Sequence, residues 1–292
     1  MTNMEQIVVK VGELDAAPRT TEESIYPNID DSFEVVPYEG RRLAVRENNV
    51  FGVKLFGNMQ ASLQGLAVYG DKLVRMANGT THYIYKLTAG GLSQVASFTA
   101  NTGHSNSLQF APFKDAGQAF PYLYVANLAK KCSVLSISSD YEVSIVQTIT
   151  IGIASVASNC NLQIGDDGYL WCFYLDSNNH HHFIKFRRVS VGERDVTLSQ
   201  SDVVDEWYSD ESYPYSTYLW QGMTIRNGHI WLSIGQIGTS QARGIFVYST
   251  VTHARVTWLD LSIFNVEFED LDFWDNSVLV ATYGSQVYRM KF

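Results

Sequence analysis

Five short segments of this chain open with polar side chains directly in front of a leucine or methionine. The candidate ligand-binding residues in and beside these openings are Gln64, His104, Asn106, Asn161, Trp220, Gln221, Glu269 and Asp270. Amides and carboxylates offer paired hydrogen-bond donors and acceptors to hydroxyl groups, and an aromatic ring can stack on the face of a sugar. These residue types predict a site for a hydroxyl-rich ligand if the fold brings them together. A polar rim that only solvates a water-filled channel would show the same residues.

Glycoside hydrolysis is the catalytic chemistry that such a set could support. It needs two carboxylates that flank one bond, as acid and base or as acid and nucleophile. The carboxylates available are Glu269, Asp270 and the nearby Asp272, and all three lie in one segment. Because two catalytic carboxylates need two segments, the sequence favours binding over catalysis; in an enzyme, Glu269 and Asp270 would be the catalytic residues. No nucleophile elbow, phosphate loop or dinucleotide fingerprint is present, so no cofactor is predicted.

Two other polar stretches resemble metal sites only at first sight. His180, His181 and His182 are consecutive, and neighbouring residues of a strand point to opposite faces, which keeps them from meeting at one ion. We expect them at a solvated hairpin tip. The acidic stretch 202–211 lacks the spacing of a calcium loop and is expected to be a solvated loop. The sequence therefore predicts no metal site.

Aromatic residues are concentrated between the third and fourth segments. They are Trp207, Tyr208, Tyr213, Tyr215, Tyr218 and Trp220. We expect them in a long connection between strands. There they would form either a ligand or partner surface or a packed layer beneath the connection.

The spacing of the five segments indicates the elements that must position these residues. Their third residues are at 66, 108, 162, 223 and 271, so the repeat is 42 to 61 residues long. A turn such as Asp166-Asp167-Gly168 or Arg226-Asn227-Gly228 follows, and then a second and a third strand-like run. Four-stranded units that recur every about 40 to 50 residues are typical of propeller blades. The sequence predicts an all-β, five-bladed β-propeller whose first strands line the axis and carry the leading polar residues to one mouth.

The fifth unit lacks a fourth strand, because the chain ends soon after its third. In the other units we expect fourth strands at 92–98, 143–151, 194–199 and 255–261. An unpaired edge would leave the ring open, and the strand-like segment Asn49–Phe56 can fill the gap. Residues 49–292 are thus predicted to form the propeller and residues 1–48 an extended arm, which could instead build part of a sixth blade. Strand-like islands at 6–11 and 33–38 suit pairing of this arm with the propeller's flank, a second copy or another protein.

One stretch resembles a known family. The peptide Gly103-His104-Ser105-Asn106-Ser107-Leu108, followed by Pro121-Tyr122-Leu123-Tyr124-Val125-Ala126-Asn127, is similar to a strand found in propeller domains of phage and prophage tail proteins, including receptor-binding proteins. The resemblance covers about 25 residues. It implies that His104 and Asn106 face the axis and that the partner is a glycan or a cell-surface receptor. Alternatively His104 fixes a loop, and the propeller is a protein-interaction scaffold.

Composition narrows the partners. The net charge is −9, and no basic cluster is larger than a pair such as Lys130-Lys131 or Arg187-Arg188, which argues against nucleic acid. No apolar run has the length of a membrane span, so we expect no membrane insertion. Residues Met1 to Asp15 show no signal peptide, which predicts synthesis in the cytoplasm and, by the resemblance, a place in a virion. The three cysteines are expected to be buried, reduced thiols.

Overall fold

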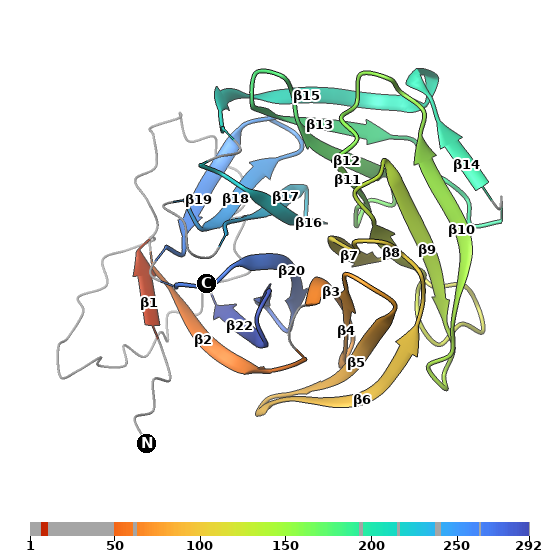
Figure 1. Ribbon diagram of the computed structural model, residues 1–292, viewed down its shortest axis with the longest axis vertical. Helices are drawn as coiled ribbons and strands as arrows, with labels where there is room; N and C mark the ends of the chain where they lie inside the picture. The colour runs from red at the N-terminus through yellow and green to blue at the C-terminus, as the bar shows by residue number, and fades with distance from the viewer. Residues whose placement is uncertain are drawn as a thin grey trace.

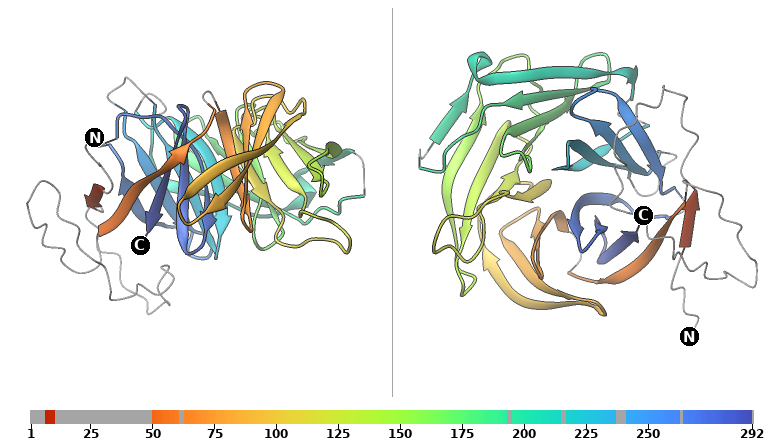
Figure 2. Two further views of the ribbon diagram at one scale, coloured as in Figure 1. Left: turned by 90° about the horizontal axis from the view of Figure 1, so that it is seen from below. Right: turned by 180° about the vertical axis from the view of Figure 1, so that it is seen from behind.

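Five β-sheets form a closed ring in this protein (Figure 1). The computed structural model describes residues 7–10, 50–60, 63–192, 195–214, 217–236, 241–262 and 264–291. Seen edge-on, the sheets stand side by side (Figure 2), and seen along the axis, the first strand of each sheet lies innermost (Figure 1). The fold is the predicted five-bladed β-propeller, and the six-bladed alternative is wrong.

The blades follow one another along the chain. Blade 1 consists of β3 (Leu63–Tyr69), β4 (Lys72–Ala77), β5 (Thr81–Thr88) and β6 (Gly91–Thr99). Blade 2 consists of β7 (Ser107–Phe110), β8 (Leu123–Ala126), β9 (Lys131–Ile137), β10 (Val143–Ile151) and β14 (Asp195–Leu198). Blade 3 consists of β11 (Asn161–Ile164), β12 (Leu170–Leu175), β13 (His180–Phe186) and β15 (Val203–Ser212). Blade 4 consists of β16 (Trp220–Arg226), β17 (His229–Ile234), β18 (Gly244–Ser249) and β19 (Arg255–Asp260). Blade 5 consists of β20 (Phe268–Trp274), β21 (Ser277–Thr282), β22 (Gln286–Lys291), β2 (Val50–Asn58) and β1 (Ile7–Lys10).

Local sequence explains the tight turn of the inner hairpin in blade 4. In blade 4, Asn227 and Gly228 connect β16 to β17 with φ angles of 50° and 70°. Asn and Gly tolerate positive φ, and a turn with two such residues matches the twist of the strands that it joins. Arg226 and His229 are therefore paired at the end of the hairpin.

An N-terminal strand closes the ring, as the sequence predicts. Strand β2 pairs antiparallel with β22, the last strand of the chain (Figure 1). Val53 of β2 is buried in the same apolar cluster as Met290 of β22. Strand β1 pairs in turn with β2, so this part of the predicted arm lies against the propeller's flank. The rest of the arm lies outside the described residues, and its bounds stay a prediction.

The outer edge of blade 3 differs from the prediction. The expected fourth strand at 194–199 corresponds to β14, which pairs in parallel with β10 of blade 2. Val196 and Leu198 are buried there with Ile149 and Ile151. The fourth strand of blade 3 is instead β15, which covers most of the acidic stretch that was predicted to be a solvated loop. A short 3-10 helix at Gln200–Asp202 directly precedes this strand.

Strand β15 forms because its side chains alternate. Trp207 stacks on Phe183 of β13 with ring centroids 4.2 Å apart. Ser209 is buried as well, whereas Glu206, Tyr208 and Asp210, which alternate with these two residues, are exposed. One face of such a strand packs on the core and the other carries charged side chains, so the composition of the whole segment is acidic. The acidic composition led to the prediction of a loop in place of a strand.

The hydrophobic core lies between neighbouring blades. Leu162 and Cys172 of blade 3, for example, share a cluster with Tyr124 and Val134 of blade 2. All three cysteines are buried and none forms a disulfide. No helix in the described part of the chain has the length and apolar character needed to span a bilayer.

Candidate functional site

The leading polar residues of blades 2, 3 and 4 meet at the axis, but they bond to one another. The Asn106 amide donates to Oδ1 of Asn161 at 3.2 Å and to the carbonyl of Gln221 at 2.8 Å. The Asn161 amide donates to the same carbonyl at 2.6 Å. Asn106 and Asn161 are buried, so their donors already join three blades.

Gln64 and Glu269 lie beside a buried arginine at the boundary of blades 1 and 5. The Arg75 guanidinium donates to the carbonyls of Gln64, Gly65 and Thr282. Burial lowers the Arg75 pKa to about 10. Burial, followed by the charge of Glu267, raises the pKa of Glu269 to about 8. Glu269 is therefore protonated at neutral pH, with its carboxyl inside the protein.

Asp270 links three blades. One carboxylate oxygen accepts the backbone N–H groups of Leu66 at 2.8 Å and Leu108 at 2.9 Å, in blades 1 and 2. Its other oxygen lies where a β-carbon on Gly222 would come within 2.1 Å, so blade 4 needs a glycine there. Burial raises the Asp270 pKa well above its usual value. The carboxyl group of Asp270 therefore accepts the hydrogen bonds that join blades 1 and 2 to blade 5.

Of the remaining predicted residues, Trp220 lies apart from this cluster. Trp220 is buried between blades 3 and 4, where it packs edge-on against Phe173 at 5.2 Å. His104 is half-buried, and partial burial lowers its pKa. Gln221 directs its amide to a carboxylate oxygen of Glu267 at 2.9 Å. The structure thus brings Gln64, Asn106, Asn161, Gln221, Glu269 and Asp270 together in the interior, and their role in binding stays a prediction.

The histidine and aromatic stretches belong to the scaffold. His181 lies on β13 and is wholly buried, so the predicted solvated hairpin tip is wrong for it. Its Nδ1 lies 2.8 Å from the Tyr248 hydroxyl, its ring stacks on Tyr213 at 4.4 Å, and burial lowers its pKa to about 3. Trp207 and Tyr208 lie on β15 and not in a connection, while Tyr215 is outside the described residues. Among the described residues, no three His, Cys, Asp or Glu side chains are placed to hold a metal ion.

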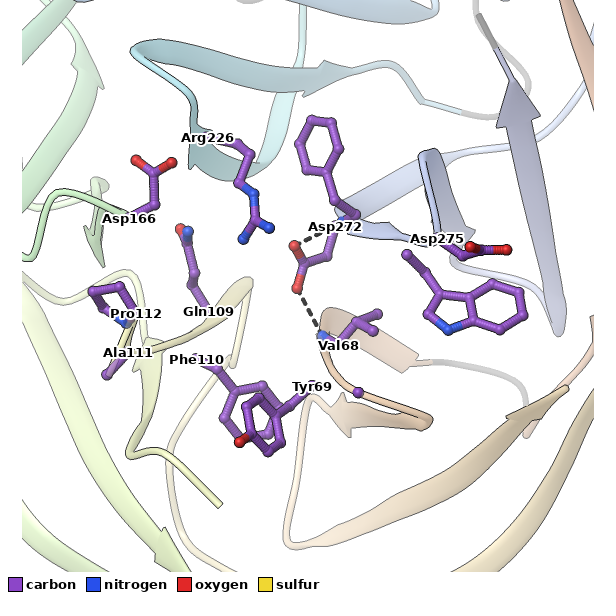
Figure 3. A pocket seen from close by; sticks show the side chains of 13 residues that line it. Val68, Tyr69, Gln109, Phe110, Ala111, Pro112, Asp166, Arg226, Asp272 and Asp275 are labelled. Atoms are coloured by element: carbon purple, nitrogen blue, oxygen red, sulfur yellow. Dashed lines mark hydrogen bonds between the residues drawn. The ribbon is translucent and has the colours of Figure 1, made fainter. Parts of the chain in front are cut away.

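A pocket opens at the opposite end of the axis, where the inner strands finish (Figure 3). Its volume is about 380 Å³, and all five blades contribute to its wall. The lining residues are Val68, Tyr69, Gly70, Gln109, Phe110, Ala111, Pro112, Asp166, Arg226, Asp272, Phe273, Trp274 and Asp275. Aromatic rings and charged groups therefore surround one axial hollow.

Gln109 crosses the axis beside this pocket. Its Nε2 donates to the carbonyl of Ile225 at 2.9 Å, and its Oε1 accepts the Ile225 N–H at 3.2 Å. Ser107, two residues earlier, bonds the backbone of Met223 in the same way, donating at 2.7 Å and accepting at 3.0 Å. Blades 2 and 4 are thus joined directly, and the axis is plugged between its two ends.

Asp272 is the buried carboxyl group of the pocket wall. Its Oδ2 accepts the Val68 N–H at 2.7 Å, and its Oδ1 accepts the Phe273 N–H at 2.7 Å. Burial raises the pKa of Asp272 to about 6, although these two hydrogen bonds and the nearby Arg226 oppose the shift. Figure 3 shows Arg226 and Asp272 pointing toward one another across the pocket.

The sequence concealed this pocket because its polar residues have ordinary explanations. Asp166 and Asp275 occur in turns, where aspartate is common. Asp166 does bond the backbone N–H of Asn227 at 2.6 Å, and Asp275 pairs with Arg289 at 3.1 Å. The later residues of the repeats do contain a signal, because Gln109 and Asp272 both occupy the fourth position of a repeat.

The chain has no match among protein-family models and none among curated proteins. Virginiamycin B lyase from Staphylococcus aureus is 14% identical, with a TM-score of 0.40 over 83% of this chain and 99% of that one. The β-propeller domain of Cps50 (Swd1) from Myceliophteria thermophila is 8% identical, with a TM-score of 0.45 over 82% of this chain and 91% of that one. Likeness this distant carries nothing about function, which must be argued from the residues of this chain.

Proposed function

We propose that this protein is a non-catalytic, ligand-binding propeller, which recognises a glycan or a glycan-bearing cell-surface receptor through the axial pocket. The observation that carries the proposal is the wall of that pocket, where five blades place aromatic side chains next to a guanidinium and carboxylates. Concave sites with apolar rings and a few convergent polar groups are the usual form of small-ligand sites. Sugars present an apolar ring face and hydroxyl groups to such a wall.

The charged groups suit hydroxyl recognition. A sugar hydroxyl can accept a hydrogen bond from Arg226 and donate one to Asp272, because these side chains point toward each other across the pocket (Figure 3). The polar residues at the leading ends of the inner strands have fewer free groups for a ligand, since the side-chain amides of Asn106 and Asn161 both donate to the Gln221 carbonyl. The pocket is therefore the better candidate of the two ends of the axis.

Binding to a glycan array, followed by calorimetry on the hits, tests this proposal. Arg226→Gln removes the charged donor of the pocket and should weaken binding by about 1 to 3 kcal/mol. Gln221→Ala, at the leading end, should leave the affinity unchanged. The reverse pattern would move the site to the leading end, and the absence of any glycan ligand would refute the proposal.

Glycoside hydrolysis is a second candidate, because the pocket contains carboxylates from two blades. Asp166 comes from blade 3 and Asp272 from blade 5, which removes the objection that all candidate carboxylates share one segment. Both, however, accept hydrogen bonds from the backbone of neighbouring blades. Sugar release by the wild type that disappears in Asp272→Asn would favour hydrolysis over binding.

A place in a phage or prophage tail is supported by the resemblance of residues 103–127 to tail propellers. The chain would then present its pocket to the surface of a bacterial host. Sedimentation of phage particles from an induced lysate, probed with an antibody against this chain, tests that assignment. A chain that stays in the supernatant would refute it without affecting the binding proposal.

A further inference from the structure

Arg226 has hydrogen-bonding capacity that the protein does not use. It is the last residue of β16, it is exposed, and it lines the axial pocket. Its guanidinium forms no hydrogen bond or ion pair with any residue that the structure describes; its nearest aromatic neighbour is Phe273, with the ring centroid at 5.9 Å. A guanidinium has five N–H donors and no acceptor, so this group is open to an oxygen-rich ligand.

The other polar side chains of the pocket are already engaged. Gln109 bonds the backbone of Ile225 with both ends of its amide. Asp275 pairs with Arg289, and Asp166 holds the backbone of Asn227. Asp272 accepts one backbone N–H at each oxygen. Arg226 is thus the one charged donor among the lining residues, and a ligand that satisfies it must bring an acceptor.

Positive charge also borders the pocket on two other sides. The ammonium of Lys114 lies over the Tyr69 ring at 6.0 Å, and the guanidinium of Arg289 lies over the Trp274 ring at 4.6 Å. Tyr69 and Trp274 are both lining residues. These cations offset the carboxylates of the wall in a protein whose net charge is −9.

We propose that the ligand of the axial pocket is a glycan with a carboxylate, which the Arg226 guanidinium binds in the space between Arg226 and Asp272. Paired N–H groups of arginine match the two oxygens of a carboxylate and hold it more strongly than they hold a hydroxyl. This inference rests on the proposed function and adds the chemical class of the ligand. Uronic acids and sialic acids both supply the required group.

Matched sugar pairs test the carboxylate. The probes are 3′-sialyllactose against lactose, and a galacturonate oligomer against its methyl ester, each titrated by calorimetry. At least one acidic probe should bind about 10-fold or more tightly than its neutral partner, as expected for a charge-assisted hydrogen bond. The pair that shows the preference identifies the source of the carboxylate.

Variants locate the effect at Arg226. Arg226→Gln should abolish the preference for the acidic probe, and Lys131→Gln, which removes an exposed cation from blade 2 outside the pocket, should retain it. Equal affinity for the acidic and neutral members of both pairs would overturn the carboxylate while leaving glycan binding in place. Failure of all four probes to bind, together with an array without hits, would overturn both proposals.

The pH dependence gives a second readout. An ionised Asp272 repels a ligand carboxylate, and its pKa of about 6 means that the repulsion weakens as the pH falls from about 7.5 to about 5. Sugar carboxylates stay ionised over this range, so binding of the acidic probe should tighten toward pH 5 in the wild type and not in Asp272→Asn.

The other charged groups near the pocket are Asp166, Asp275 with Arg289, and Lys114, while His229 is paired with Arg226 in the hairpin. His229→Gln should keep the pH dependence; if it abolishes the trend, the assignment to Asp272 is wrong.

Discussion

Asp270 and Asp272 lie two residues apart on β20 and face the same neighbouring blade, yet they have different roles. Asp270 is closed off from solvent and holds the backbones of blades 1 and 2. Asp272 holds the backbone of blade 1 and also forms part of the pocket wall. A step of two residues along an inner strand therefore separates a structural carboxyl from one that a ligand can reach.

The sequence identified these residue types but not how deeply the leading residues of the inner strands are buried. Register shifts between Leu63 and Leu66, between Trp220 and Met223, and between Phe268 and Asp270 interrupt the pairing at the leading ends of three inner strands. A bulge re-aims side chains, and the alternation of polar and apolar residues does not reveal one. Long-range partners such as the Gln221 carbonyl, which satisfies two asparagines, are equally invisible in a single sequence.

Glu269 yields a prediction at the residue scale. Its pKa is about 8 in the folded protein and about 4.5 when exposed, so between these pH values the folded state keeps a proton that the unfolded chain releases. The free energy of unfolding should therefore fall as the pH rises through this window. Glu269→Gln has no such proton, and it should gain stability relative to the wild type by up to ~1.4 kcal/mol per pH unit. Urea unfolding at about pH 5 and about pH 8 measures the difference.

The control for this experiment is Glu142→Gln, which changes an exposed carboxylate. Its stability should run parallel to that of the wild type at both pH values. A parallel course for Glu269→Gln as well would mean that the folded protein does not hold this proton.

Strand order was predictable from the sequence where a blade is built from consecutive strands, and it was not where the chain leaves that order. The closing strand β2 followed from a missing partner at the C-terminal edge. Strand β14 did not, because Val196 and Leu198 would fit the apolar side of either blade 2 or blade 3. The longer β15 occupies the edge of blade 3 with Trp207 in the core, which leaves the edge of blade 2 for β14.

Removal of the closing strand tests its contribution at the scale of elements. A chain that begins at residue 59 lacks β2, which exposes the edge of β22 and removes Val53 from its buried cluster. Thermal and urea unfolding should show a loss of about 3 kcal/mol or more. A chain that begins at residue 50 keeps β2 and, of the described strands, lacks only β1, so it should stay close to the full-length protein. Equal stability of the two truncated chains would show that β2 does not close the ring.

Across the whole molecule, the axis is a bonded structure and not an open channel. Ser107 and Gln109 of blade 2 each bond a backbone segment of blade 4, which is not their neighbour in the ring. Repeat proteins whose units touch only adjacent units tend to lose cooperativity as the array grows. Bonds across the axis couple blades that neighbouring contacts alone would not couple.

We therefore expect the propeller to unfold in a single transition. Tryptophan fluorescence reports mainly on blades 3 and 4, which contain five of the six tryptophans, whereas far-ultraviolet circular dichroism reports on all strands. The two urea curves should coincide. Gln109→Leu leaves the N–H and C=O of Ile225 without partners and should shift both curves together, by about 2 to 4 kcal/mol. Separate midpoints for the two probes, in the wild type or in this variant, would show that the blades unfold independently and that the axial bonds do not couple them.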